Sequence, residues 1–122
     1  SLASLRGKVV YLDFWASWCG PCRVSFPQLA QLRNELGSRG FEVYAINVDV
    51  VEADATQFLA EVPVSYLVVR DAGGATPEAY GILGMPTGYL IDRQGVVRHV
   101  HQGFKKTDGA LLRTEIVELL GE

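Results

Sequence analysis

The sequence predicts an α/β sandwich, in which a β-sheet packs against helices. Short segments rich in β-branched and aromatic residues alternate along the chain with segments of helical periodicity. The first of these strand segments, residues 8–15 (KVVYLDFW), is apolar on both sides, which is typical of a strand covered on both faces. A chain of 122 residues is close to the commonest domain size, so residues 1–122 are expected to form one domain.

The remaining elements follow from the spacing of apolar residues and from the Gly and Pro residues between segments. The first helix is expected to begin at or directly after Cys19 and to end at Gly37. In chain order, the predicted elements after the first strand are a helix at 19–36, a strand at 41–48, a helix at 53–61, a strand at 64–69, a helical turn at 77–80, strands at 87–92 and 96–102, and a helix at 107–120. The last two strands are predicted to form a hairpin around residues 92–95, and Thr107 or Asp108 to cap the last helix.

Composition and charge exclude several classes of protein. Hydrophobic residues make up 48% of the chain and charged residues 20%, which is ordinary for a globular domain and excludes a disordered or fibrous chain. Eleven Lys and Arg against fourteen Asp and Glu give a net charge of −3, which argues against a surface for nucleic acid or anionic membrane. No apolar segment approaches the roughly 20 residues that a membrane-spanning helix needs. Any signal peptide or anchor is expected upstream of Ser1.

The segment Trp18-Cys19-Gly20-Pro21-Cys22 lies where the predicted first strand passes into the first helix. Two cysteines three positions apart at a helix start lie on one side of the first turn, close enough for a disulfide. A zinc site would need two further ligands, but the chain has no other cysteine and its two histidines lie far away in sequence. We therefore interpret the pair as redox-active. The alternative, a purely structural disulfide, would close so short a loop that it would stabilise the fold little.

The two cysteines have different predicted roles. Cys19 lies at the N-terminal end of the predicted helix. The unpaired backbone N–H groups and the positive end of the helix dipole there favour the thiolate form of Cys19. It is therefore the predicted nucleophile, and we expect its side chain to be exposed to solvent at the end of the first strand. Cys22 lies deeper, and we expect it to resolve the mixed disulfide that Cys19 forms. Gly20 and Pro21 between them limit the backbone freedom of the segment.

Several motifs resemble the thioredoxin superfamily. They are FWASWCGPCR at residues 14–23, Pro27, the segment Gly84-Met85-Pro86-Thr87, LRGKVV at 5–10 and PTGYLID at 86–92. Pro27 resembles the proline that kinks the active-site helix of the superfamily, and residues 84–87 resemble its cis-proline loop. The opening segment, the cysteine motif and the PTGYLID motif are closer to the TlpA-like and ResA-like branch.

The resemblance implies a thioredoxin-like α/β fold, with a central mixed β-sheet and helices on both faces. It also implies the extra strand and helix of that branch, for which residues 64–81 are available. In the family, the cis-proline loop packs against the disulfide, and the backbone before the proline pairs with the substrate chain. The resemblance therefore implies that Gly20, Pro21 and Pro86 contact substrate. Trp18 and Met85 are expected to line an apolar rim around Cys19, with ordinary packing as the alternative for both.

Three positions depart from the pattern of the branch. Ser25 stands where the branch often has Glu, and Asp13 stands where it often has Asn, although Asp matches ordinary thioredoxin. The Lys that accompanies this Asp in thioredoxin is replaced by Ala45 in our alignment. These departures leave the identity of the substrate open.

Asp13 is a carboxyl group inside an apolar strand, with no cationic residue nearby in sequence. Loss of solvent is expected to raise its pKa, and a carboxylate with a raised pKa can accept a proton near neutral pH. We therefore predict that Asp13 is the general base for Cys22. The alternative is a structural carboxylate whose oxygens accept hydrogen bonds from backbone or water.

Three further polar residues carry weaker predictions. Glu52 is the nearest candidate for an acid that ResA-like proteins carry after the second strand, but a solvated glutamate at a helix start is favoured. His99 and His101 share one face of a strand and could bind a metal together. Two ligands without a nearby carboxylate or thiol make this unfavourable, so no metal site is predicted and both histidines are expected to be exposed.

The predicted function is reduction of protein disulfides by thiol–disulfide exchange, without a cofactor. The expected partners are protein disulfide substrates and an upstream dithiol reductase, and the domain is expected to be a monomer. The resemblance implies an exported, periplasmic location, a possible membrane tether outside this chain, and a role in maturation of cytochrome c or copper proteins. A cytosolic thioredoxin is the first alternative. A copper carrier using both thiols is disfavoured, because no Met cluster or third soft ligand accompanies them.

Overall fold

The computed structural model describes residues 6–49, 51–64, 66–70 and 86–122, and the structural statements below refer to these residues. The elements in chain order are β1 Val9–Trp15, α1 Cys22–Leu36, the short 3-10 helix η2 Gly37–Arg39, β2 Phe41–Asn47, α2 Glu52–Glu61, β3 Leu67–Arg70, β4 Thr87–Ile91, β5 Val97–Gln102 and α3 Asp108–Leu120. The predicted alternation of strands and helices is confirmed. The predicted turn at residues 77–80 lies outside the described residues.

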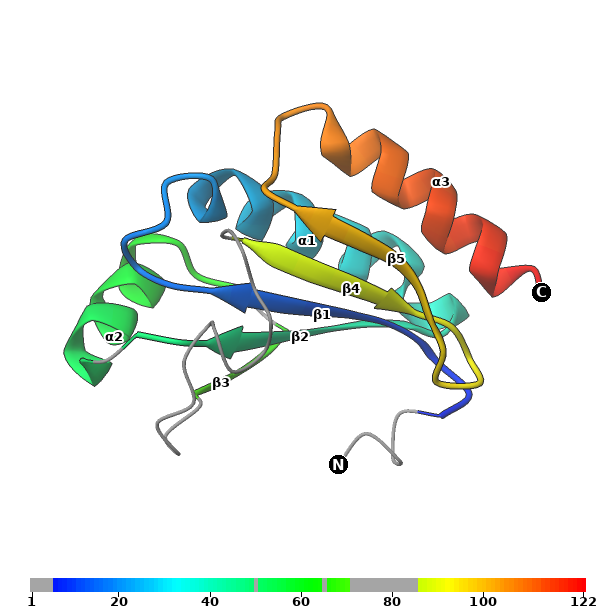
Figure 1. Cartoon of the computed structure of the whole chain (residues 1–122), viewed down its shortest axis with the longest axis horizontal. Helices are drawn as coiled ribbons and strands as arrows, with labels where there is room; N and C mark the ends of the chain where they lie inside the picture. The colour runs from blue at the N-terminus through cyan, green and yellow to red at the C-terminus, as the bar shows by residue number, and fades with distance from the viewer. Residues whose placement is uncertain (1–5, 50, 65, 71–85) are drawn as a thin grey trace.

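The five strands form one mixed sheet in the order β3-β2-β1-β4-β5, with β1 at its centre (Figure 1). β1 pairs with β2 in parallel, as β2 does with β3, whereas the β1–β4 and β4–β5 pairs are antiparallel. The register places Asp13 between Ala45 on β2 and Gly88 on β4. Position 45 is therefore the neighbour of Asp13, as our alignment predicts, and the residue there carries no charge.

The connections determine where the helices lie. The β1-α1-β2 and β2-α2-β3 units both join adjacent parallel strands and advance in the same direction, so right-handed crossovers place α1 and α2 on one face. α3 contacts both α1 and β1. Side chains of all three helices belong to one core cluster with alternate residues of β1. In the described part of the chain, no helix packs against the other face of the sheet. A helix on that second face therefore stays a prediction.

The core beneath the carboxyl end of β1 is aromatic. Trp15 is fully buried, and its ring centroid lies 4.7 Å from that of Phe26 on α1 and 4.8 Å from that of Phe58 on α2. The centroids of Phe26 and Phe58 lie 5.2 Å apart. Because these three rings join β1, α1 and α2, they provide a rigid base for the segment that follows Trp15.

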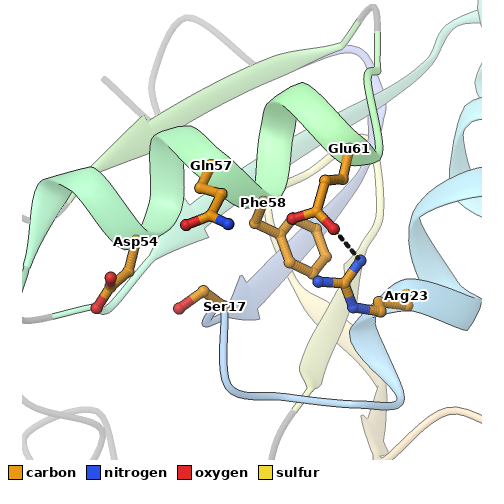
Figure 2. A pocket seen from close by; sticks show the side chains of 6 residues that line it. All are labelled: Ser17, Arg23, Asp54, Gln57, Phe58 and Glu61. Carbon is orange, nitrogen blue, oxygen red and sulfur yellow. Dashed lines mark ion pairs between the residues drawn. The ribbon is translucent and has the colours of Figure 1, made fainter.

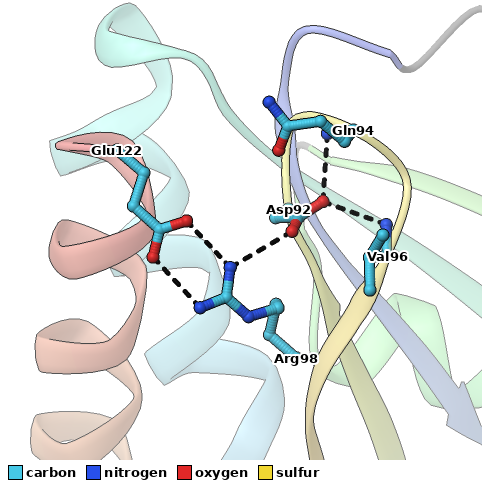
Figure 3. Close-up of polar contacts among 5 residues, drawn as sticks. All are labelled: Asp92, Gln94, Val96, Arg98 and Glu122. Carbon is cyan, nitrogen blue, oxygen red and sulfur yellow. Dashed lines mark hydrogen bonds and ion pairs between the residues drawn. The ribbon is translucent and has the colours of Figure 1, made fainter.

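The β4–β5 hairpin is closed by a buried carboxylate (Figure 3). Asp92 Oδ1 accepts hydrogen bonds from the N–H groups of Gln94 and Val96, at 3.0 and 2.9 Å, and Oδ2 accepts one from Arg98 at 3.2 Å. These bonds, led by the one from Val96, hold the pKa of Asp92 below its ordinary value. Arg98 also bonds Glu122, which ties the hairpin to the end of α3. The predicted hairpin around residues 92–95 is confirmed.

Some predicted boundaries are wrong. The first helix begins at Cys22 rather than at Cys19, because the Cys19 N–H bonds back to the Ala16 carbonyl and closes a turn before the helix. β3 covers Leu67–Arg70 rather than residues 64–69. Thr107 occupies the N-cap position of α3, as predicted, but its side chain makes no capping hydrogen bond.

Gly88→Ala is expected to destabilise the fold by roughly 1–3 kcal/mol, the usual effect of overpacking a core. A Cβ at this buried position on β4 would overlap the hydroxyl and ring carbons of Tyr11 on β1. Gly37→Ala is the matched control, since its Cβ would meet only Arg33 side-chain atoms at 4.0 Å in a helical conformation. Urea unfolding measures both changes. Equal stabilities of the two variants would contradict the close packing of Tyr11 against Gly88.

Candidate active site at the carboxyl end of β1

The disulfide Cys19–Cys22 lies directly after the turn that follows β1, with the two Cα atoms 5.4 Å apart. Cys22 is the first residue of α1, and its N–H donates a hydrogen bond to the Cys19 Sγ atom at 3.3 Å. The first turn of α1 contains no acidic side chain. A donor aimed at the sulfur and a helix N-terminus free of negative charge both favour a thiolate at Cys19 once the disulfide is reduced.

The burial of the two cysteines differs in part from the prediction. Cys22 is fully buried, as expected for a resolving cysteine. Cys19 is only 3% exposed, whereas the sequence predicted an exposed nucleophile. The bond to Cys22 directs the Cys19 side chain inward, toward the start of α1, and this accounts for its burial in the disulfide form.

Three of the residues predicted to contact substrate, Trp18, Gly20 and Pro21, flank the cysteines in the chain. Trp18 is 66% exposed, and Gly20 and Pro21 are exposed as well. Pro86 is buried, and its carbonyl accepts a hydrogen bond from the Gly103 N–H at 2.7 Å. Met85 and the expected cis-proline conformation before Pro86 lie outside the described residues. A large exposed aromatic ring beside a reactive pair is suited to contact a peptide substrate.

Asp13 lies on the same face of β1 as Trp15, toward α1, and is 1% exposed. Its Oδ2 atom has no hydrogen-bond partner in the described structure. Burial raises the pKa of Asp13 from its ordinary value to about 8, as the sequence predicted in direction and cause. A carboxyl group with this pKa is mostly protonated at pH 7, and its deprotonated fraction can accept a proton from a thiol within reach.

Tyr66 is a buried residue near Asp13 that the sequence analysis missed. Its ring packs against Phe26 with centroids 5.8 Å apart, and its hydroxyl has no hydrogen-bond partner in the described structure. Burial, followed by the charge of Asp13, raises the pKa of the Tyr66 hydroxyl. Nothing in the local sequence marks this tyrosine, because only the parallel pairing of β3 with β2 brings it under α1.

A second missed group connects the turn before Cys19 with the end of β2. Asp49 is 6% exposed and accepts hydrogen bonds from both the N–H and the hydroxyl of Ser17, at 2.9 and 2.8 Å. Asn47 Nδ2 donates to Asp49 as well, at 2.7 Å. The sequence could have indicated that Ser17 and Asp49 lie close together. Both follow strands that are predicted to be adjacent, and residues just beyond the carboxyl ends of adjacent parallel strands meet at one edge of the sheet.

A polar pocket of about 210 Å³ lies between this turn and α2 (Figure 2). Its lining residues are Ser17, Arg23, Asp54, Gln57, Phe58 and Glu61. The Arg23 guanidinium lies over the Phe58 ring, 4.8 Å from its centroid, and forms an ion pair with Glu61 at 3.6 Å. α2 therefore forms a polar, charged wall beside the disulfide.

The remaining sequence candidates lie apart from this site or at the surface. Glu52 is exposed at the first position of α2, consistent with the favoured prediction of a solvated helix-start glutamate. The prediction that both histidines are exposed is wrong. Glu115 of α3 pairs with His99 Nδ1 at 2.9 Å and with His101 Nε2 at 2.6 Å, and the His101 side chain is only 14% exposed. In the described part of the chain, no group of three or more His, Cys, Asp or Glu residues could hold a metal ion.

Comparison with known proteins places the chain among redox proteins. The Redoxin family model matches residues 1–116. The thiol-disulfide oxidoreductase ResA of Oceanobacillus iheyensis is 36% identical over 102 residues, which cover 84% of this chain and 53% of ResA. The thiol:disulfide interchange protein DsbE of Pseudomonas aeruginosa is 38% identical over 98 residues, covering 80% of this chain and 52% of DsbE. The chain thus spans about half the length of these curated relatives.

A solved structure supports the same relationship. The crystal structure of a candidate thiol:disulfide interchange protein DsbE from Chlorobium tepidum is 49% identical, with a TM-score of 0.92. The match covers 98% of this chain and 85% of that protein. The thioredoxin-like fold and the resemblance to the TlpA-like and ResA-like branch are therefore confirmed. Since the family model covers nearly the whole chain, the chain belongs to the Redoxin family.

Proposed function

We propose that this chain is a thiol–disulfide oxidoreductase domain that reduces disulfides of other proteins through Cys19 and Cys22. The observation that carries the proposal is the disulfide at the start of α1, in which the Cys22 N–H is aimed at the Cys19 sulfur. The names of the ResA and DsbE relatives support the same chemistry.

The proposed reaction is a sequence of two exchange steps. The Cys19 thiolate attacks one sulfur of a substrate disulfide, forming a mixed disulfide and releasing the other substrate sulfur as a thiolate. The Cys22 thiol then gives its proton to Asp13 and attacks the Cys19 sulfur. This step releases the second substrate thiolate, which takes up a proton, and leaves the Cys19–Cys22 disulfide. A separate dithiol donor then reduces this disulfide and returns both cysteines to the thiol form.

Substrate contact is proposed for the residues around the disulfide. The exposed ring of Trp18 supplies apolar area, and Gly20 and Pro21 present backbone without bulky side chains. Pro86 lies at the start of β4, and the family resemblance assigns the backbone before it to pairing with the substrate chain. Met85 is proposed as a further apolar contact on the same resemblance.

The proposed setting is an exported compartment, where a membrane-bound dithiol reductase would supply electrons. Maturation of cytochrome c or of a copper protein is the proposed pathway, on the resemblance to the TlpA-like and ResA-like branch. In the described residues, no helix is long and apolar enough to span a bilayer, and any tether is proposed to lie outside this chain.

The proposed activity is tested with the recombinant reduced protein, which should reduce a disulfide peptide in stoichiometric amounts. Failure with every peptide tested would contradict the proposed activity.

The reduction potential of the Cys19–Cys22 pair is expected nearer about −270 mV than about −120 mV. The charged residues that line the pocket beside Ser17 are Asp54, Glu61 and Arg23, and Arg23 is paired with Glu61, so we expect this pocket to add little stabilisation to the thiolate. A weakly stabilised thiolate makes the reduced form a good electron donor. Titration against glutathione redox buffers measures the potential. A value above about −150 mV would make the domain an oxidant instead.

A further inference from the structure

The segment between β1 and α1 carries the reactive cysteine, and the backbone hydrogen bonds described within it are local. Trp18 is 66% exposed, so packing of its ring does not immobilise the segment. In the described structure, the backbone N–H groups of Cys19 and Cys22 bond carbonyls three residues earlier, those of Ala16 and Cys19. Local bonds of this kind close a turn without fixing its orientation relative to the sheet.

The side-chain bonds of Ser17 connect this segment to a distant part of the chain. The Ser17 N–H donates to Asp49 Oδ2 at 2.9 Å, and its hydroxyl donates to Asp49 Oδ1 at 2.8 Å. Both oxygens of one carboxyl group therefore hold the backbone and side chain of a single residue, two positions before Cys19. Such a two-point contact restrains orientation as well as distance.

Asp49 is itself held in place. Asn47 Nδ2 donates to Asp49 Oδ2 at 2.7 Å, and the Asp49 N–H donates to Asn47 Oδ1 at 3.0 Å. Asn47 is the last residue of β2 and is 1% exposed, and the Val48 N–H donates to the Trp15 carbonyl at 3.0 Å. The carboxyl group is thus anchored to the central strands, and a buried, fully engaged polar network of this kind rigidifies its surroundings.

We propose that Asp49 is a positioning residue for thiol–disulfide exchange: it holds Ser17 against the end of β2 and thereby orients Cys19 for attack. The inference rests on the proposed function. It assigns the effect of Asp49 to the geometry of its hydrogen bonds, and not to direct contact with substrate. A small misplacement of a reacting atom lowers a rate strongly, by as much as about 10²-fold for a shift of ~1 Å.

The test compares three variants in a Cys22→Ser background, where Cys19 is the only thiol. Asp49→Ala removes both carboxylate oxygens, which accept the bonds from Ser17 and from Asn47 Nδ2. Asp49→Asn keeps one acceptor oxygen, and its amide can donate to the Ser17 hydroxyl, so it retains the contact without the charge. Asp92→Ala is the matched control, because Asp92 is also 6% exposed and also ties a turn by accepting N–H bonds, at the β4–β5 hairpin.

The measurement is the rate of Cys19 alkylation by iodoacetamide across pH 6 to 10, with thermal unfolding recorded for each variant. Asp49→Ala is expected to lower the rate at pH 7 by about tenfold, while Asp49→Asn stays within about threefold of the parent and rescues most of the loss. Asp92→Ala is expected to lower the melting temperature while its alkylation profile overlays that of the parent.

Two results would overturn the inference: an Asp49→Ala profile that overlays the parent, or equal losses in the Asp49→Ala and Asp92→Ala variants. If Asp49→Ala does not fold, Ser17→Ala decides, since it removes only the hydroxyl bond and is expected to lower the rate in the same direction by a smaller factor. Because alkylation needs no protein substrate, this test is independent of the proposed reductase activity. The proposed reductase activity is tested separately, and it is contradicted if the native reduced protein reduces no disulfide peptide.

Discussion

Cys22→Ser is expected to accumulate covalent complexes with its protein partners, whereas Cys19→Ser is expected to form none. The Cys22→Ser variant keeps the attacking thiol, with the N–H of residue 22 still aimed at the Cys19 sulfur, but it has no second thiol to release the substrate. Cys19→Ser leaves only Cys22, which is fully buried at the start of α1 and is unable to reach a substrate disulfide. Either variant should lose reductase turnover by at least about 10³-fold, as expected when a residue of a catalytic unit is removed.

The measurement is trapping in cells followed by gels run with and without a reductant. Complexes that disappear on reduction should be seen with Cys22→Ser, and the double variant Cys19→Ser with Cys22→Ser is the control for unrelated adducts. Equal trapping by the two single variants would show that the roles of the cysteines are not distinct.

Asp13→Asn is expected to slow release of the mixed disulfide by about 10²-fold, the usual size of general-base assistance, while attack by Cys19 persists. The substitution keeps the shape of the side chain but removes the group that accepts the Cys22 proton. In the native protein the release rate should rise with pH through the Asp13 pKa of about 8, because only the deprotonated carboxylate is a base. Single-turnover kinetics with a disulfide peptide separate the two steps. If the variant and the native protein release the mixed disulfide at the same rate from pH 6 to 9, Asp13 has only a structural role.

The same substitution has a consequence for stability. The ordinary pKa of the Asp13 carboxyl is 3.8, and its pKa in the folded protein is about 8. Between these values the folded protein retains a proton that the unfolded chain has released, so the free energy of unfolding falls as pH rises through this range. Asp13→Asn removes this dependence and is expected to be the more stable protein at pH 8, by a few kcal/mol. Urea unfolding at pH 5 and pH 8 measures the free energy of unfolding of both proteins. If that free energy changes with pH by the same amount in the native protein and in Asp13→Asn, the raised pKa is contradicted.

The cysteine pair was recognisable from local sequence alone. Two thiols three residues apart at a strand-to-helix junction can form a disulfide whatever the rest of the fold does, because the geometry of one turn determines their separation. The burial of Asp13 was predictable for a similar reason. A strand that is apolar on both sides has no solvent-facing side, so a carboxyl group within it loses its hydration and its pKa rises.

The start of α1 could be predicted only to within one turn. Helical periodicity extends back to Cys19, but the hydrogen bond from the Cys19 N–H to the Ala16 carbonyl closes a separate turn, so the helix begins at Cys22. The pairing of His99 and His101 was also hidden, because their partner Glu115 comes from another element, α3. In both cases the outcome depended on hydrogen bonds, which the spacing of apolar residues does not reveal.

The sequence by itself located the residues on which the proposed chemistry depends: Cys19 and Cys22 through their identity and spacing, and Asp13 through its place in an apolar strand. Only the tertiary structure decided what surrounds and orients that chemistry. Ser17 and Asp49 meet because β1 and β2 are adjacent and parallel, so the segments beyond their carboxyl ends lie side by side. Tyr66 comes near Asp13 because β3 adds to the same sheet. Contacts between residues distant in sequence depend on which strands pair, so the local pattern of residues around one partner does not by itself identify the other.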